Sequence, residues 1–290
     1  MKRVYYSVLC LAALAVVACN KEGAQTAGES LCANAYISSD ATRTVYEVGN
    51  YGDKTGAKVS WDTVESFKAY YDGGTAPVVF SKTAAGTSFT AESVPEGVSV
   101  STPFTGLYGS AATLNPDGKI DIDFSKQDGE ADNLSAYDVM TAMSELKEGA
   151  LSFAFKHNCA ILRLKCVNYT VNPVSKVRLR FLKAQVSVGF GGTGFYVNAG
   201  KYVSLSINLK TPVEAGSAVK DKGTVGFRYV IVPVIGYQKS SYEGIPIGEF
   251  DEFSNSIELS ETKSIEAGKV YDVLCECGVE GNESGEIEAD

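Results

Sequence analysis

The chain has 290 residues and a formal net charge of −9, with 26 Lys and Arg against 35 Asp and Glu. This acidic balance excludes nucleic acid as a partner, because phosphate binding needs clustered Lys and Arg. After its first residues the sequence has no long helical period. It consists of short segments rich in Val, Ile, Tyr, Phe and Thr, separated by Gly, Pro, Asp and Asn, which is typical of β-strands.

The N-terminus has the form of a secretion signal. Lys2 and Arg3 precede the apolar run SVLCLAALAVVA, and small residues end the run just before Cys19. The run is too short for a transmembrane helix. It resembles the lipobox of bacterial lipoproteins, in which cleavage falls just before a cysteine that is then acylated. The resemblance implies a signal peptide over residues 1–18 and acyl chains such as palmitate on Cys19, holding the protein to the outer membrane. A plain secretory peptide cut elsewhere is the alternative.

The composition predicts how the rest of the chain is divided. Residues 19–30 are small and polar and are expected to form a flexible tether. Residues 279–290 are acidic and are expected to form a disordered tail. About 270 residues follow the signal, enough for two domains. The polar stretch SELKEGA over residues 144–150 suggests the junction, so we predict an N-terminal β domain over residues 31–147 and a C-terminal β domain over residues 148–278.

Alternation of apolar and polar residues predicts half-buried strands. In residues 119–124, KIDIDF, the side chains of Ile120, Ile122 and Phe124 share one face. Segments 151–157 and 160–166 read as one long strand with a break at Asn158. Further strands are expected over residues 57–61, 66–71, 78–80, 176–188, 202–209, 225–232 and 269–277. Pro233 ends its strand because it lacks an N–H donor. Many short strands without helices between them predict an all-β fold of two antiparallel β-sandwich domains with few short helices.

The stretch Gly189 to Gly194, GFGGTG, matches the G-x-G-x-x-G pattern of dinucleotide sites. Such a site needs a helix directly after the glycines, whose N-terminus holds the pyrophosphate. The residues that follow, FYVNAGKYVSLSINL, have a strand pattern instead. The sequence therefore predicts an exposed connection between strands and no cofactor.

Catalytic and metal-binding patterns are weak. Five cysteines follow the anchor, namely Cys32, Cys159, Cys166, Cys275 and Cys277, and we expect buried thiols or at most one disulfide. A zinc site would need a cluster of Cys and His, and His157 is the single histidine. Asp121 and Asp123 are expected on a solvated strand face rather than in a catalytic pair or cation site. No Ser lies in a G-x-S-x-G frame, so no enzymatic activity is expected.

Taken together, the segments resemble the fimbrillin-like lipoproteins, the subunit family of type V pili. The resemblance spans most of residues 31–277 and rests on Arg43-Thr44, Val59-Ser60-Trp61, Asp138-Val-Met140-Thr-Ala142, Phe155-Lys156-His157 and Gly268-Lys269-Val270-Tyr271. The chain departs from the family at Leu107-Tyr108-Gly109, where a Tyr-Pro is common. The resemblance implies two β-sandwich domains of transthyretin-like character.

The resemblance also implies a mechanism of assembly. A protease cuts after Arg43, so that the chain begins at Thr44, the first strand is lost, and a strand of another pilus subunit fills the groove. The removable strand is Leu31 to Ile37, with Leu31, Ala33, Ala35 and Ile37 on one face. The alternative is that Arg43 is an ordinary loop residue. The acidic tail would be a poor donor strand because buried carboxylates are costly, which favours a tip, accessory or anchor subunit over a stalk subunit.

Two other functions remain open at this point. In a surface glycan-binding lipoprotein, Trp61, Tyr70 and Tyr71 would stack on sugars, although core packing or cross-strand pairing is expected for them instead. The other alternative is a hydrolase whose carboxylates are dispersed along the chain. The expected partners are other pilus subunits, the membrane through the lipid anchor, and a ligand on a host or bacterial surface.

Overall fold

The structure, a computed structural model, describes residues 30–38, 49–53, 64–83, 86–114, 120–179, 185–188, 205–217, 222–234, 266–278 and 287–289. Nearly all regular structure in this part of the chain is β-strand. The helices described are α1 (Leu134–Tyr137) and the 3-10 helices η2 (Phe124–Lys126) and η3 (Ala131–Asn133). The prediction of an all-β fold with few short helices is confirmed. No helix among the described residues has the length and apolar character needed to cross a membrane.

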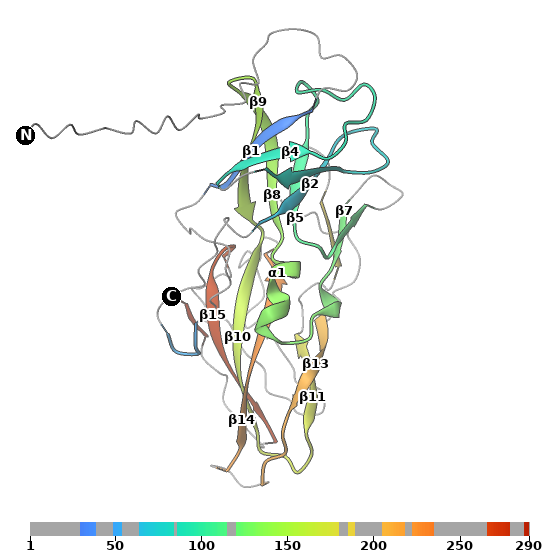
Figure 1. Cartoon of the computed structure of the whole chain (residues 1–290). Coiled ribbons are helices and arrows are strands. Elements are labelled where there is room, and N and C mark those ends of the chain that lie inside the picture. The colour runs from blue at the N-terminus through green and yellow to red at the C-terminus, as the bar shows by residue number, and fades with distance from the viewer. Residues whose placement is uncertain are drawn as a thin grey trace, which may run out of the picture.

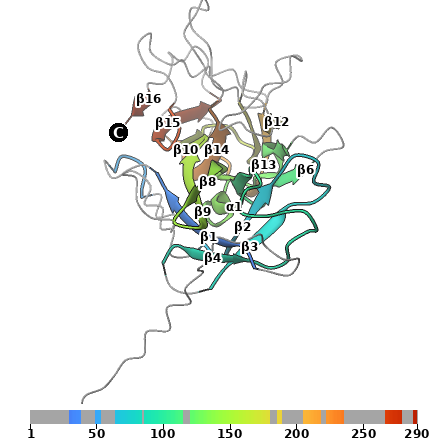
Figure 2. The same ribbon diagram turned by 90° about the horizontal axis from the view of Figure 1, so that it is seen from above.

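Strands at one end of the molecule form a closed seven-stranded barrel, referred to below as the closed sheet (Figure 1). Its order is β1 (Cys32–Ile37), β4 (Ser88–Ala91), β3 (Val78–Lys82), β2 (Ser66–Tyr70), β5 (Thr105–Tyr108), β8 (Met140–Lys147) and β9 (Ala150–His157). The sheet closes because β1 pairs with both β4 and β9. This part of the chain therefore forms one closed sheet, whereas the sequence predicted a sandwich of two separate sheets. Figure 2 views it from above.

The remaining strands form the second module. The strands β14 (Thr224–Pro233), β10 (Cys159–Asn168), β15 (Val270–Cys277) and β16 (Ile287–Ala289) make one sheet in that order. A pair consists of β11 (Val174–Leu179) and β13 (Leu205–Val213). A third sheet has the order β12 (Gln185–Val188), β7 (Ile120–Asp123) and β6 (Ala112–Leu114). Strands β10, β14 and β15 extend along the long axis of the molecule (Figure 1).

Each sheet system has its own hydrophobic core. The core of the closed sheet contains Phe67, Phe80, Phe89, Phe153 and Phe155 together with alanines of β1 and β2. The second core lies along β10, which is buried at nearly every position. Tyr70 and Leu107 belong to strands of the closed sheet but pack in the second core. These two side chains join the sheets through a shared apolar contact.

The predicted domain boundary between residues 147 and 148 is not where the sheets divide. It falls at the Glu148-Gly149 turn that joins β8 to β9 within the closed sheet. The stretch SELKEGA is polar because it forms the exposed end of this hairpin. The chain passes to the second module at Asn158, between β9 and β10. Moreover, residues 112–139 contribute Ala112, Ile122, Phe124, Leu134 and Tyr137 to the second core, so the two cores are interleaved in sequence.

Most strands predicted from alternation are present. The predictions for β2, β3, β14 and β15 are confirmed within two residues at their ends, as are the break at Asn158 and the end of β14 at Pro233. Residues 176–188, predicted as one strand, contain parts of β11 and all of β12. Residues 287–289, in the predicted disordered tail, form β16 against β15. Residues 57–61 and Gly189 to Gly194 lie outside the described residues.

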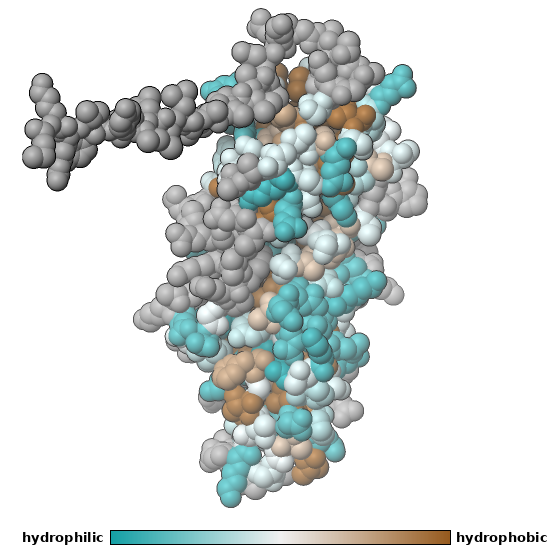
Figure 3. Space-filling view, in the orientation of Figure 1, coloured by the Kyte–Doolittle hydropathy of each residue, from teal (hydrophilic) through white to brown (hydrophobic). Residues whose placement is uncertain are grey.

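The described surface is mainly hydrophilic on the face shown in Figure 3, with scattered apolar groups. The large hydrophobic side chains that are exposed among the described residues are Tyr36, Leu146, Val171, Val225 and Phe227. Val225 and Phe227 lie two positions apart on β14, where Tyr51 packs against Phe227 with ring centroids 6.2 Å apart. Only part of this apolar strand face is therefore open to solvent.

The cysteines of the second module should be inert while the protein is folded. Cys159, Cys166, Cys275 and Cys277 are buried thiols, whereas Cys32 is half-buried. Burial raises the pKa of Cys159 and of Cys275, whose sulfur also lies against that of Cys166. Burial and the nearby Cys166 raise the pKa of Cys277 to about 12. A thiol reacts as its thiolate, so Cys159, Cys275 and Cys277 lack both access and the reactive form, and Cys166 lacks access.

We expect iodoacetamide to label the folded Cys10→Ser/Cys19→Ser protein at Cys32 alone, and to label Cys159, Cys166, Cys275 and Cys277 as well in urea. Peptide mass spectrometry gives the labelled sites. The control is the same protein with Cys32→Ser added, which should stay unlabelled while it is folded. A mass two hydrogens lower, with Cys166 linked to Cys275 across β10 and β15, would contradict this expectation.

Candidate functional site

The candidate site is the position that β1 occupies between β4 and β9, called the β1 slot below. Strand β1 runs antiparallel to β4, with Ala33 opposite Phe89. It runs parallel to β9, with Ala35 opposite Phe153 and Ile37 opposite Phe155. The amide of Ala35 donates to the carbonyl oxygen of Thr87 at 2.9 Å. Both edges of β1 are thus engaged, one with each neighbour.

The inward face of β1 is the one predicted from the sequence. Leu31, Ala33 and Ala35 are buried, with exposed fractions of 2% or less, and Ile37 is half-buried against the same core. Asn34 and Tyr36 point outward and are exposed. A shift of one residue in register would bring Asn34 inside and turn the alanines to solvent. The alternation therefore fixes how a strand must lie in the slot.

The wall of the slot is aromatic. Phe67 of β2 contacts four other rings in the closed sheet, at centroid distances of 5.1 Å to Phe80, 5.2 Å to Phe89, 5.0 Å to Phe153 and 5.2 Å to Phe155. Phe89 lies on β4 and Phe153 and Phe155 lie on β9, the two strands that flank β1. These rings fill the interior, which leaves room for only small side chains at the middle of β1.

A second feature joins the segments on which the sequence resemblance rested. The Nδ1 atom of His157 lies 3.1 Å from the Asp138 carboxylate, and both side chains are buried. Gly268 has a φ of +77°, and a Cβ atom built on it would lie 3.5 Å from the His157 ring. Its amide donates to the carbonyl oxygen of Cys159 at 2.8 Å. The Asp138, His157 and Gly268 segments therefore meet where the closed sheet joins the second module.

The His157 pair is sensitive to pH in a defined direction. Burial lowers the pKa of His157, but the charge and the hydrogen bond of Asp138 together raise this pKa by more than burial lowers it. The pKa of His157 therefore lies above its ordinary value. Burial and the Asp138 charge raise the pKa of Tyr108 and of Cys159. His157 therefore keeps its proton to a higher pH than an ordinary histidine does.

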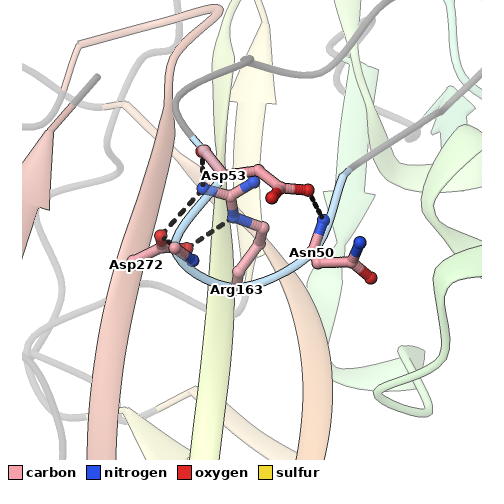
Figure 4. A network of polar contacts seen from close by, with 5 residues as sticks. Asn50, Asp53, Arg163 and Asp272 are labelled. Atoms are coloured by element: carbon pink, nitrogen blue, oxygen red, sulfur yellow. Dashed lines mark hydrogen bonds and ion pairs between the residues drawn. The ribbon is translucent and has the colours of Figure 1, made fainter.

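The segment 49–53 is fixed to the second module by a polar network, called the clamp below (Figure 4). Arg163 of β10 is buried and donates from Nη2 to Asp272 of β15 at 2.9 Å and to the carbonyl oxygen of Asp53 at 2.9 Å. The amide of Gly52 donates to the Asp272 carboxylate at 2.7 Å. The amide of Asn50 donates to the Asp53 carboxylate at 2.7 Å. Tyr51 adds a ring contact to Phe227.

The clamp is not among the features that the sequence predicts. Arg163 and Asp272 are single charges in alternating strands, 109 residues apart. The available signal was an Arg in the otherwise apolar run Ala160-Ile-Leu-Arg-Leu, since a buried guanidinium requires a partner. Cys19, Arg43, Thr44 and Trp61 all lie outside the described residues. Arg43 and Thr44 fall in the stretch that links β1 to the clamp.

The aromatic and acidic residues singled out earlier have structural roles. Tyr70 is buried in the second core and so is unavailable to stack on a sugar. Tyr71 packs edge-on against Phe104 at 5.8 Å. Asp123 accepts a hydrogen bond from the amide of Ser125 at 2.9 Å and caps η2. Among the described residues, no group of three or more His, Cys, Asp and Glu side chains could hold a metal ion.

Comparison with known proteins gives matches among solved structures alone, since no family model and no curated protein matches the chain. A candidate cell adhesion protein from Bacteroides uniformis is similar, with 16% identity, a TM-score of 0.46, and 90% of this chain and 98% of that chain covered. A candidate cell adhesion protein from Bacteroides ovatus has 14% identity and a TM-score of 0.45, with 90% and 96% covered.

The tip fimbrial protein Mfa3 from Porphyromonas gingivalis, with a C-terminal truncation, has 11% identity and a TM-score of 0.25, with 90% of this chain and 98% of that chain covered. These structures are of cell adhesion and fimbrial proteins, the kind of protein that the sequence resemblance names. At TM-scores below 0.5 the likeness carries no argument about function, which has to rest on the residues of this chain.

The Asp138–His157 pair should make stability depend on pH. Because the folded pKa of His157 is raised, its stabilising effect is complete below the pKa of the unfolded chain and is lost as pH rises through the folded value. We expect the free energy of unfolding, measured in urea, to fall more steeply for the native sequence than for His157→Gln as the pH rises above about 6.5, the ordinary pKa of a histidine side chain. The Lys156→Gln control should keep the steeper dependence, and equal slopes for the native sequence and His157→Gln would refute the assignment.

The clamp should contribute far more to stability than a surface ion pair. Replacing the buried Arg163 by Leu leaves the half-buried Asp272 carboxylate without its guanidinium partner, so a loss of about 3 kcal/mol in the free energy of unfolding is expected. The control is Lys147→Ala, which breaks the exposed Lys147–Glu145 pair and should cost far less, because an exposed ion pair is screened by solvent. The double variant Arg163→Met/Asp272→Leu should recover most of the loss, and equal costs for the first two variants would contradict the role assigned to the clamp.

Proposed function

We propose that this chain is a cell-surface lipoprotein of the fimbrillin type, a structural or adhesive pilus subunit that assembles by strand exchange after proteolysis at Arg43. The observation that carries the proposal is the β1 slot. Strand β1 pairs with the edges of both β4 and β9 and places its inward side chains in the closed sheet. It does so from the N-terminal end of the described chain. A strand from another subunit could make the same backbone hydrogen bonds and fill the same interior.

The position of Arg43 supports the proposed cleavage. Residues 39–48 link the end of β1 to the clamp, and Arg43 is the only arginine between Arg3 and Arg163. An arginine-specific protease would therefore have one site in this part of the chain. Cleavage there would separate β1 from the body, while the clamp would hold the new N-terminal segment, beginning at Thr44, on the second module.

The proposed lipid anchor lies on the same side of the cut as β1. Cys19 precedes Leu31 by twelve positions, so cleavage after Arg43 would detach the body from its acyl chains in the step that frees β1. A subunit that is not cut would keep both its anchor and its own β1. Processing would thus decide between a membrane-bound form with a filled slot and a released form that needs a partner strand.

The C-terminal segment favours a tip, accessory or anchor subunit over a stalk subunit. Its residues Ile287–Ala289 pair with Tyr271–Val273 of the same chain. The residues before this strand, GVEGNESGE over 278–286, are mostly acidic or glycine, and burying such carboxylates in the slot of a neighbour would be costly. The chain is therefore better suited to receive a strand than to give one.

The proposal predicts a specific N-terminus. In surface material from cells that carry the native sequence, mass spectrometry should find chains that begin at Thr44 in species of high mass. With Arg43→Gln, the chain should begin at acylated Cys19 and run as a monomer. The Arg43→Lys control keeps the positive charge and should also remain uncut if the protease is specific for arginine.

Other N-termini would contradict either the cleavage or the lipid anchor. If every native chain in surface material carries acylated Cys19 and runs as a monomer, polymerisation by strand exchange is wrong for this protein. If the uncut Arg43→Gln chain begins at a residue other than Cys19, or carries Cys19 without an acyl group, the lipid anchor is wrong. The two parts of the proposal are therefore tested separately.

A further inference from the structure

The shape of the β1 slot specifies the kind of strand that fits it. We infer that the slot selects a partner strand with the inward sequence large–small–small–large, running parallel to β9. This inference rests on the proposed function, and it adds which strands the slot accepts and which it rejects. The argument depends on the described contacts of β1, β4 and β9.

The two small positions follow from the residues opposite them. Ala33 lies between Phe89 of β4 and Leu151 of β9, its partners in the two pairings. Ala35 lies opposite Phe153. Both alanines are essentially inaccessible to solvent, and the rings beside them already contact Phe67 at about 5 Å. A larger side chain at either position would have to displace an aromatic ring from a packed interior.

The two large positions lie at the ends of the slot. Leu31 is completely buried, and its carbonyl oxygen accepts from the amide of Ala91 at 2.9 Å. Ile37 is half-buried opposite Phe155. At these ends an aliphatic side chain fills space that an alanine would leave empty, which costs stability. The inward pattern of β1 therefore matches its surroundings at all four positions.

The opposite wall of the interior is also filled. Gly106 of β5 has no side chain, and a Cβ atom built on it would lie 2.8 Å from Phe153 and 3.0 Å from Phe155. The rings of β9 are therefore enclosed on the β5 side as well, and they cannot move aside easily to admit a larger residue at position 35. The limit on side-chain size is thus imposed from two directions.

The outward positions carry no comparable limit. Asn34 is exposed, and Tyr36 is 37% exposed. Substitutions there change solvent contacts but not the packed interior. A strand can therefore vary at the outward positions and still fit the slot. A larger side chain is rejected only at the inward positions. This contrast between adjacent positions supplies a matched control.

Competition between peptides tests the inference. The full Cys19→Ser chain is treated while folded with an arginine-specific protease, and material cut after Arg43 alone is selected by mass. Its two pieces are kept together and refolded from urea with a labelled peptide in excess. The reference peptide has the sequence of residues 30–38 with Cys32→Ser. A second peptide adds Ala33→Leu and Ala35→Leu, and a third adds Asn34→Leu alone. Uptake is measured by fluorescence anisotropy and by native mass spectrometry.

We expect the third peptide to be taken up like the reference, and the second to be taken up at least about tenfold less well, because its two leucines overpack the interior. Equal uptake of all three would overturn the size rule and leave strand exchange standing. If none of the three is taken up while the cut chain refolds with its own β1, strand exchange itself fails, together with the inference that depends on it.

A second measurement, on the uncut full chain, separates poor fit from poor refolding. Ala35→Leu should lower the free energy of unfolding in urea, and Asn34→Leu should leave it nearly unchanged. If Ala35→Leu is as stable as the native sequence, the interior accommodates a large residue and the size rule is wrong, whatever the peptides show.

Discussion

The closed sheet depends on the pairing of β1 with both β4 and β9. Backbone N–H and C=O groups need partners when they are buried, and an open sheet edge invites pairing with another chain. In this protein the short β1 pairs with the backbone groups at the edges of both β4 and β9. The side chains of Leu31, Ala33 and Ala35 also cover the interior. The interaction that completes the folded subunit is therefore of the same kind as the one that would join two subunits.

The second module is built so that it does not depend on β1. Its core contains no β1 residue, and the clamp around Arg163 holds residues 49–53 on β10 and β15. The Asp138–His157 pair and Asn158, whose side chain donates to Thr141 at 2.7 Å, connect it to the closed sheet. A change confined to the β1 slot would thus leave a packed framework in place.

Much of the strand content could be predicted from the sequence, since the alternation over β15 records burial on one face and the mainly apolar run of β10 records burial on both. The inward face of β1 followed from the same pattern. The short β4 and β5 could not be predicted, because their Ser, Thr and Gly residues have no strand pattern of their own. They form strands because they pair with strands that are distant in sequence. The end of β8 is exposed and mostly polar, so its sequence is like that of a domain junction. The clamp depends on a pairing over 109 residues, which local patterns do not contain.

The direction of β1 has a mechanical consequence. Strand β1 runs parallel to β9, and β9 continues through Asn158 into β10, which is held between β14 and β15. A pull along a strand in the slot would load its backbone hydrogen bonds in shear, all together, rather than peel them apart one at a time. The tension would then pass along one continuous stretch of chain into β10, which is buried at nearly every position and paired on both sides, so a load on the slot would be carried by the core of the second module.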